Sequence, residues 1–312
     1  MFRDRRIKNQ QVFIHKCQLP SGTFRLSPDS EVINPYFTNL GLLALTEIGD
    51  CEPVKQHLLW YLKHVSPNGY VNDYRYRYPH EIDTGTADSE DSYHATFFSL
   101  LYEYIKQSED LHWFMAIRDQ LASILQSLCK LQCPDGLTWA KHSYKVKYLM
   151  DNCEVYQGLI DASQLFHLMN DRKNAHLAEQ CALACKQGIN RTYKEKTNSF
   201  AIYGSTYPTW TKWYPDATSQ AFPLVYEIIE SSSSQAISLY NKIIGGFPHF
   251  ELFEIKDSYP WMIMGLCAHV MNDRDRVKRM TQAADNLYIN GPRQNYWVLH
   301  EAGRYIQLVL RQ

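Results

Sequence analysis

Apolar residues recur along most of the chain at spacings of three and four positions, which is the period of an amphipathic helix. This pattern predicts about eleven helices, most of them in consecutive pairs. The expected pairs are residues 34–48 with 52–65, 90–107 with 110–131, 151–169 with 171–191, 217–230 with 233–244, and 258–271 with 274–288, and a last helix follows near 297–310. The chain is therefore expected to be all-α and built from repeated helical hairpins.

The connections between these helices are of two kinds. Turns within a pair are short and polar, as in Asn170-Asp171-Arg172, and each offers a residue that can cap the next helix. Links from one pair to the next are longer and aromatic, as in Cys133–Trp139, and their turn residues predict short hairpin strands. The opening stretch Gln11–Leu26 is expected to be a similar strand–turn–strand that closes a ring. Long aromatic links on one face indicate that this face is the functional one.

Acidic or amide residues open five of the expected inner helices, directly after turns rich in Pro, Gly or aromatic residues. The openings begin at Asn34, Asp88, Asp151, Asp216 and Asp257. The intervals between them are long enough for an inner helix, an outer helix and a return loop. If the repeats close into a ring, we expect these side chains to converge at one mouth.

Paired helices joined by Pro-Asp-Gly-x-x-Trp links, as at residues 134–139, resemble the six-hairpin (α/α)6 toroid of many glycoside hydrolases. The resemblance covers nearly the whole chain as one domain, residues 1–312, with an incomplete sixth hairpin. The acidic segment 86–95 is loosely similar to the inner-helix signature of family 8 glycosidases, although that family's glutamate on the first inner helix has no counterpart beyond Glu31. A likeness to unsaturated glucuronyl hydrolases implies catalytic roles for Asp91 and Asp151.

Glycoside hydrolysis needs one protonated and one ionised carboxyl group on either side of the scissile bond. Helix starts favour the ionised form, whereas crowded carboxylates raise the pKa of one member. Asp91, Asp151 and Asp216 are the predicted catalytic residues. Asp88 and Glu154, each three positions from one of them, are further candidates. The alternative for each aspartate is a simple helix cap, which stabilises by about 1 kcal/mol.

Aromatic and amide side chains near the helix openings are candidates for binding sugar. The run from Trp210 to Pro215 offers a flat apolar platform for sugar rings, and Trp139 lies at a comparable place. The stretch from Tyr74 to Tyr78 is either an acidic-sugar site or an exposed edge strand. The full set of predicted substrate-binding residues is Asn34, Tyr36, Trp139, Tyr156, Trp210, Trp213, Gln220 and Trp261.

Composition and charge narrow the function classes. The chain has 312 residues, of which 45% are hydrophobic, so it can bury a large core. A net charge of −1 and a pI near 6.9 give no reason to expect nucleic acid or an anionic membrane as a partner. No apolar run approaches the roughly 20 residues of a spanning helix, and no secretory signal is visible, so a cytoplasmic location is expected. The cysteine spacings are typical of buried helix positions, so we expect neither a metal nor a cofactor.

The residues thus predict a hydrolase that acts on an oligo- or polysaccharide, with inversion as the favoured outcome. One alternative is a terpenoid cyclase, because Asp88-Ser89-Glu90-Asp91 approximates the acidic motif of those enzymes and residues 132–139 resemble their Gln-Trp repeat. A second is a toroid that binds a glycan without cleaving it. A sugar lyase using Tyr93, His94 or Tyr156 is a third.

Overall fold

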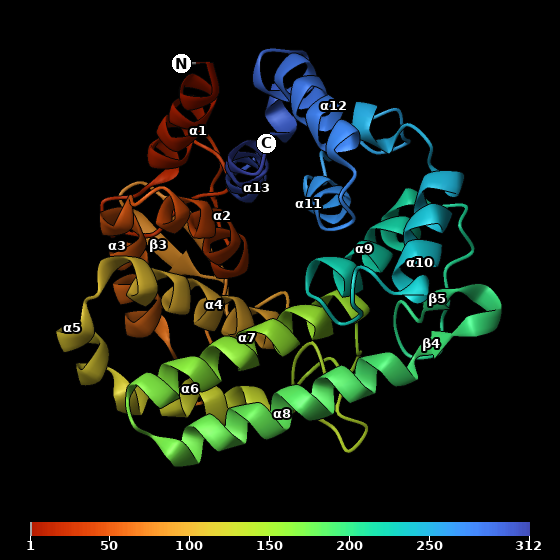
Figure 1. Cartoon of the computed structure of the whole chain (residues 1–312). Helices are drawn as coiled ribbons and strands as arrows, with labels where there is room; N and C mark the ends of the chain where they lie inside the picture. The colour runs from red at the N-terminus through yellow and green to blue at the C-terminus, as the bar shows by residue number, and fades with distance from the viewer. Residues whose placement is uncertain (1) are drawn as a thin grey trace.

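Six inner helices form a closed ring in the computed structural model, which describes residues 2–312 of the chain, with side chains from Asp4 onward (Figure 1). Each inner helix packs against the next one, and the last packs against the first. In chain order they are α2 (Pro35–Glu47), α4 (Glu90–Ser108), α7 (Leu149–Leu168), α9 (Thr218–Val225), α11 (Ile263–Val270) and α13 (Leu299–Leu310). The all-α toroid expected from the sequence is confirmed.

A second layer of helices surrounds this ring and covers its outer side (Figure 1). Most outer helices follow their inner partner directly in the chain. They are α3 (Cys51–His64), α5 (Leu111–Ala116) with α6 (Arg118–Leu131), α8 (Arg172–Arg191), α10 (Ser234–Gly246) and α12 (Arg274–Ala284). None of the helices within residues 2–312 is both long and apolar enough to cross a membrane.

The two ends of the described chain together make the sixth hairpin. Helix α1 (Phe2–Cys17) packs on α13 as its outer partner. Trp297, just before α13, donates from Nε1 to Oε1 of Gln10 at 2.8 Å, and Arg6 forms a salt bridge with Asp285 at 2.9 Å. The hairpin that the sequence left incomplete is therefore completed by a segment from the other end of the chain.

The prediction of a strand–turn–strand over Gln11–Leu26 was wrong for its first half. Residues up to Cys17 are helical, and only a single antiparallel bridge between Gln18 and Phe24 encloses a turn. Helix α1 escaped prediction because it is highly charged and, among its described side chains, fully buries only Ile14 and Cys17 of its apolar residues. The apolar period is too sparse to mark it as a helix.

Several predicted helices are shorter than their apolar patterns suggested. Helix α9 ends at Val225, before Glu227 adopts a left-handed backbone, and α11 begins only at Ile263, after Trp261 does the same. The predicted helix 110–131 is divided at Ile117 into α5 and α6. Because α11 starts late, the residues before it are free to line the mouth of the ring.

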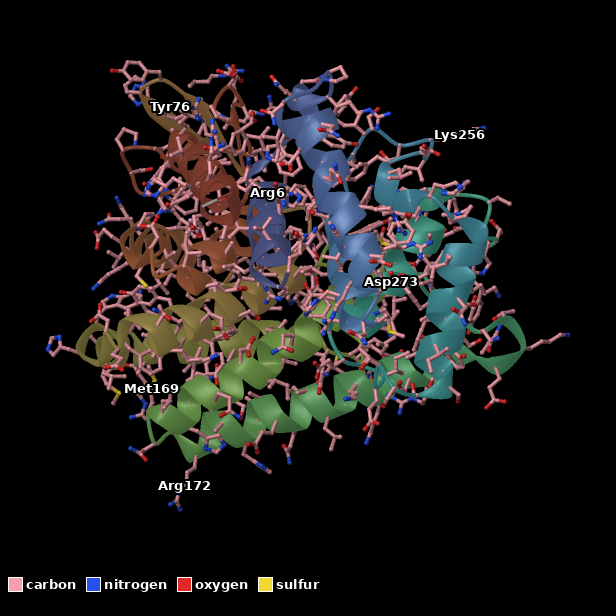
Figure 2. The ribbon with its side chains drawn as sticks, turned by 45° about the horizontal axis from the view of Figure 1, so that its top comes forward. Arg6, Tyr76, Met169, Arg172, Lys256 and Asp273 are labelled. Carbon is pink, nitrogen blue, oxygen red and sulfur yellow. The ribbon has the colours of Figure 1, made fainter. Side chains whose placement is uncertain are left out.

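Short strands lie in the links between hairpins. Strands β1 (Val32–Ile33), β2 (Tyr74–Arg77) and β3 (His80–Asp83) form an antiparallel sheet, and β4 (Tyr193–Lys194) pairs with β5 (Ser199–Phe200). In β2 the side chains alternate, so that Tyr74 is buried and the two arginines are exposed. Figure 2 shows Tyr76 of this sheet at the opposite edge of the molecule from Arg172, which is the first residue of α8.

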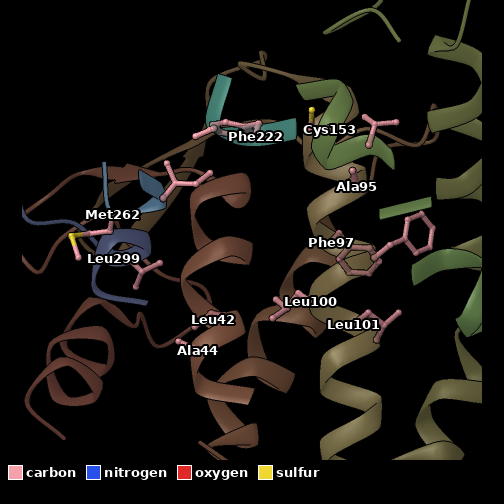
Figure 3. Close-up of a cluster of buried hydrophobic side chains, with 14 of the residues drawn as sticks. Leu42, Ala44, Ala95, Phe97, Leu100, Leu101, Cys153, Phe222, Met262 and Leu299 are labelled. Carbon is pink, nitrogen blue, oxygen red and sulfur yellow. The ribbon is translucent and has the colours of Figure 1, made fainter. Parts of the chain in front are cut away.

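The hydrophobic core fills the space between the helices of the ring and those around them. Figure 3 shows buried side chains of this core on neighbouring inner helices, among them Leu42 of α2, Leu100 of α4 and Cys153 of α7. Two inner contacts are closer than side chains allow. A Cβ atom on Gly158 of α7 would lie 2.4 Å from the carbonyl oxygen of Ala95, and one on Gly303 of α13 would lie 2.4 Å from that of Gly41.

Gly158→Ala is expected to lower the free energy of unfolding by about 1–3 kcal/mol, because the new methyl group forces α4 and α7 apart. Gly245→Ala is the matched control, since a Cβ there meets no atom within 4 Å. It should leave stability unchanged or raise it by up to about 1 kcal/mol. Urea unfolding of both variants measures the difference, and equal effects would contradict the close packing of the inner ring.

Candidate active site

A cavity of about 700 Å³ opens at the end of the ring where the inner helices begin. Its walls combine the first turns of α2, α4, α7 and α13 with the links that precede α7, α9 and α11. Pockets that hold small ligands measure roughly 300–1,000 Å³, so the size fits a bound molecule. The lining residues are Tyr36, Phe37, Asp88, Ser89, Ser92, Tyr93, Ala140, Lys141, Ser143, Tyr144, Tyr148, Met150, Asp151, Tyr214, Phe222, Tyr259, Trp261, His300 and Arg304.

Asp151 lines the cavity from the first turn of α7. Its Oδ2 accepts a hydrogen bond from Ser89 Oγ at 3.1 Å. Burial raises the pKa of Asp151 well above its ordinary value, and the negative charges of Asp91 and Glu154 raise it further. A carboxyl group in this environment holds its proton to a higher pH than an exposed one and can give it up to a ligand in the cavity.

Asp91 lies behind Asp151, fully buried, and does not line the cavity. Its Oδ1 accepts from Ser89 Oγ at 2.6 Å, so one hydroxyl group contacts both carboxyl groups. Its Oδ2 accepts from Thr138 Oγ1 at 2.6 Å. Burial raises the pKa of Asp91 to about 6 against these hydrogen bonds, which favour the ionised form. The structure thus brings two of the predicted aspartates together, with only Asp151 at the cavity surface.

Asp88 lines the mouth of the cavity and is exposed to solvent. It precedes α4, which begins at Glu90, so it does not share a helix face with Asp91. Its backbone amide donates to the hydroxyl group of Tyr93 at 3.3 Å, and that hydroxyl group donates to Asp73 at 2.7 Å. Asp88 is thereby held at the edge of the cavity, where water reaches its carboxyl group.

Asp73 was not predicted as a site residue. It directly precedes β2, and burial raises its pKa to about 6. Asn34 donates from Nδ2 to Asp73 at 3.0 Å and to Tyr93 OH at 2.7 Å, while its own Oδ1 caps α2 by accepting from the amide of Phe37. The predicted binding residue Asn34 therefore holds the wall of the cavity in place and does not line it.

Glu154 lies one turn along α7, beneath the floor of the cavity. Its Oε1 accepts hydrogen bonds from the hydroxyl groups of Tyr36 at 2.8 Å and Tyr226 at 3.3 Å. Burial raises the pKa of Glu154 to about 7, although these bonds and the charge of Arg304 oppose the rise. Tyr36 itself lines the cavity, as predicted for a substrate-binding residue. Glu154 is therefore connected to the cavity through its hydrogen bond with Tyr36.

The wall formed by α13 contributes a cationic group that the sequence did not single out. Arg304 and His300 line the cavity, and Glu301 lies behind them. Glu301 is fully buried, yet the hydrogen bond from His300 and the charge of Arg304 outweigh that burial and lower its pKa to about 2. It also accepts from the amide of Met262 at 2.6 Å. The only sequence signal was the helical spacing of 300, 301 and 304, which places all three on one side of the helix.

Trp261, another predicted binding residue, lines the cavity from the link before α11. Its Nε1 donates to Asp257 at 2.8 Å, and its ring stacks on Tyr214 with centroids 5.1 Å apart. Tyr214 is the only residue of the predicted platform from Trp210 to Pro215 among the residues that line this cavity. Of the predicted platform, the ring of Tyr214 is therefore the part that lines this cavity.

Asp216 and several predicted binding residues lie away from the cavity. Asp216 is buried and accepts from the amide and the hydroxyl group of Thr209 at 3.0 and 2.8 Å. Gln220 is fully buried and bonds the backbone amide and carbonyl groups of Phe200. Trp213 is buried against Phe250. These three side chains hold the link before α9 and its neighbours in place.

The remaining predicted binding residues are half-buried aromatic rings that lie under lysine side chains outside the cavity. They are Trp139 under Lys145, Tyr156 under Lys186 and Trp210 under Lys242. His94, a candidate in the lyase hypothesis, is buried and bonds the carbonyl oxygens of Glu90 and Gly69. Within residues 2–312, no group of three or more His, Cys, Asp or Glu side chains is placed to hold a metal ion.

No family model matches the sequence, and neither does any curated protein. Solved structures do match. A wild-type glycosidase superposes with a TM-score of 0.73 at 10% identity, covering 98% of this chain and 96% of the other. A metal-independent α-mannosidase of Streptococcus pneumoniae, in a non-productive complex with α-1,6-mannobiose, gives 0.73 at 10% identity over 98% and 92% of the two chains.

The chain has the fold of the six-hairpin glycosidases. A rhamnosidase from Klebsiella oxytoca with bound rhamnose also matches, with a TM-score of 0.67 at 13% identity over 91% of this chain and 54% of the other. At these identities the likeness establishes the architecture of the toroid. The chemistry of its mouth has to be argued from the residues that line it.

Asp151→Asn is expected to raise the melting temperature at about pH 8. The pKa of Asp151 is higher in the folded than in the unfolded chain, so the stability of the wild type falls as the pH rises between those two values. Asparagine carries no charge, and the gain should therefore shrink as the pH falls toward 4. Asp88→Asn, which changes an exposed carboxyl group of the same cavity, is the control. Thermal unfolding across a range of pH values measures the melting temperatures of both variants. An effect of Asp151→Asn that does not change with pH would contradict the raised pKa of Asp151.

Proposed function

We propose that the protein hydrolyses O-glycosyl bonds of an oligo- or polysaccharide by general acid–base catalysis in this cavity. One observation carries the proposal. The cavity has a half-buried carboxylic acid with a raised pKa on its wall, Asp151, and a solvent-exposed carboxyl group at its mouth, Asp88. Two carboxyl groups in unlike environments are what glycoside hydrolysis requires.

Asp151 is assigned the role of general acid, which donates its proton to the oxygen of the leaving sugar. Asp91 acts from behind it, because its negative charge helps keep Asp151 protonated in the free enzyme. Ser89 contacts both carboxyl groups and orients the acid toward the cavity. In this scheme Asp91 is a positioning residue and does not touch the substrate.

Asp88 is assigned the role of general base. Its exposure leaves its carboxyl group accessible to water. An inverting reaction requires that this water attack the sugar from the side opposite Asp151. Proton NMR of the first-formed anomer during hydrolysis tests this outcome. A first product with the same anomeric configuration as the substrate would make the second carboxylate a nucleophile instead.

The aromatic lining supports a carbohydrate as the ligand. Tyr36, Tyr214 and Trp261 present flat rings to the cavity, while Lys141 and Arg304 supply hydrogen-bond donors for hydroxyl groups. Among the solved structures of this fold, one glycosidase is in complex with glucose and the α-mannosidase with mannobiose. We propose that a sugar of this size occupies the same end of the toroid here.

The charged and titratable side chains in the wall argue against the terpenoid cyclase alternative. A cyclase requires an apolar pocket below its acid, whereas Arg304, His300 and Lys141 line this cavity together with two carboxyl groups. One observation favours the lyase alternative, which is that its candidate residue Tyr93 lines the cavity. An unsaturated sugar product, visible by its ultraviolet absorbance, separates lyase action from hydrolysis.

Asp151→Asn is expected to lower kcat by about 10²–10⁴-fold, which is the usual contribution of a general acid. The measurement is reducing-sugar release from a panel of glucans, mannans, rhamnosides and uronic-acid oligosaccharides. Asp216→Asn is the control, because Asp216 lies outside the cavity, and its loss should lower the melting temperature more than the rate. Equal turnover of Asp151→Asn and wild type would remove the proposed mechanism.

Asp91→Asn is expected to move the alkaline limb of the pH–rate profile to lower pH, by about one unit. Asp91 raises the pKa of Asp151 through its negative charge, and the acid must be protonated to act. The substitution therefore makes Asp151 lose its proton earlier as the pH rises. Profiles of kcat/KM for wild type and variant give the shift. A limb that stays in place, or moves to higher pH, would contradict the coupling.

A further inference from the structure

Exposed tyrosine rings gather along one side of the cavity mouth. Tyr144 and Tyr214 line the cavity and are 48% and 51% exposed, and Tyr148 stands beside them. Tyr203 is 41% exposed but lies outside the cavity. Large exposed aromatic side chains that adjoin one another mark a surface used for binding.

Tyr203 is tied to the cavity wall through Tyr148. The two residues form an antiparallel backbone bridge, and their ring centroids are 6.0 Å apart at an angle of 67°. The amide of Leu149 donates to the carbonyl oxygen of Ile202 at 2.9 Å, and a turn closed by Thr206 follows. The Tyr203 ring is therefore held at a fixed place next to the wall that Tyr148 provides.

The exposed ring of Tyr203 adjoins the cavity through Tyr148, which lines it. A gap of about 10 Å³, too small for a sugar, separates Tyr148 from Tyr203 and Gly204, so a ligand there would rest on the exposed ring of Tyr203. A Cβ atom built on Gly204 meets nothing within 4 Å, so the space above this turn is open. Lys147, the lysine at its border, is already paired with Asp135 at 2.6 Å. The surface beside this turn therefore offers the exposed ring of Tyr203 next to a lysine that is already paired.

We propose that Tyr203, with Tyr148, forms a further sugar-binding subsite outside the cavity. It would take an uncharged sugar ring of an oligosaccharide whose chain leaves the cavity over this side of the mouth. One apolar face of such a ring packs on a tyrosine ring, while the hydroxyl groups of sugar and tyrosine remain free to form hydrogen bonds. The subsite rests on the proposed hydrolase function, and it implies that the substrate is longer than the cavity.

Chain-length dependence tests the subsite. The substrates are the di- to hexasaccharides of the gluco- and manno-series, used with the series that the wild type cleaves. Tyr203→Ala should lower kcat/KM for the longest members by roughly 3- to 10-fold and leave the disaccharide unchanged. Tyr203→Phe keeps the ring and should retain most of the activity. Tyr78→Ala removes a tyrosine that is 86% exposed at the end of the β2–β3 hairpin, away from the cavity, and serves as the control.

A uniform loss at all lengths, or no change at any length, would overturn the subsite. Affinity electrophoresis in gels cast with mannan or β-glucan measures binding of the polysaccharide and therefore tests the subsite independently of hydrolysis. If the wild type cleaves nothing, but Asp151→Asn is retarded and Asp151→Asn/Tyr203→Ala is retarded less, the hydrolase fails and the subsite stands. If cleavage occurs and both variants migrate alike, the subsite alone fails. If neither cleavage nor retardation is seen, both are overturned.

Discussion

Closure of the inner ring is the constraint on which the rest of the molecule depends. Helix α13 has to approach α2 closely enough for the backbones to touch, and the two helices meet at Gly41 and Gly303, where a side chain would collide. Helix α1 then packs on α13 from outside. Without this closure the first turns of α2, α4, α7 and α13 would face solvent separately, and no enclosed cavity would exist at their ends.

The closed ring brings several carboxyl groups close to one another. Asp151, Asp91 and Glu154 lie close enough for each of the last two to raise the pKa of the first, and burial raises all three. The guanidinium group of Arg304 does not cancel this effect at Asp151, because its hydrogen bond goes to Glu301 at 3.1 Å. Negative charge thus remains unbalanced beside Asp151, and the field of its neighbours favours the protonated form of that residue.

Each of these carboxyl groups accepts a hydrogen bond from at least one hydroxyl group. Ser89 is shared by Asp91 and Asp151, whereas Tyr36 and Tyr226 donate to Glu154. The result is a cavity whose reactive groups are few and whose walls are largely aromatic. Such a surface favours ligands with both flat apolar faces and many hydroxyl groups, which is the character of a sugar.

The sequence by itself determined most of the helices, with α1 as the exception, the pairing within the first five hairpins and the end of the ring at which the polar openings meet, because a period of three to four residues is a local property. It also indicated Asp88, Asp151, Tyr36 and Trp261, which line the cavity. Only the tertiary structure decided that Asp91 and Asp216 lie behind the surface and that His300 and Arg304 reach it. Which side chains of a helix face the cavity depends on the rotation of that helix about its axis. Packing against neighbours distant in sequence, such as α1 against α13, sets that rotation.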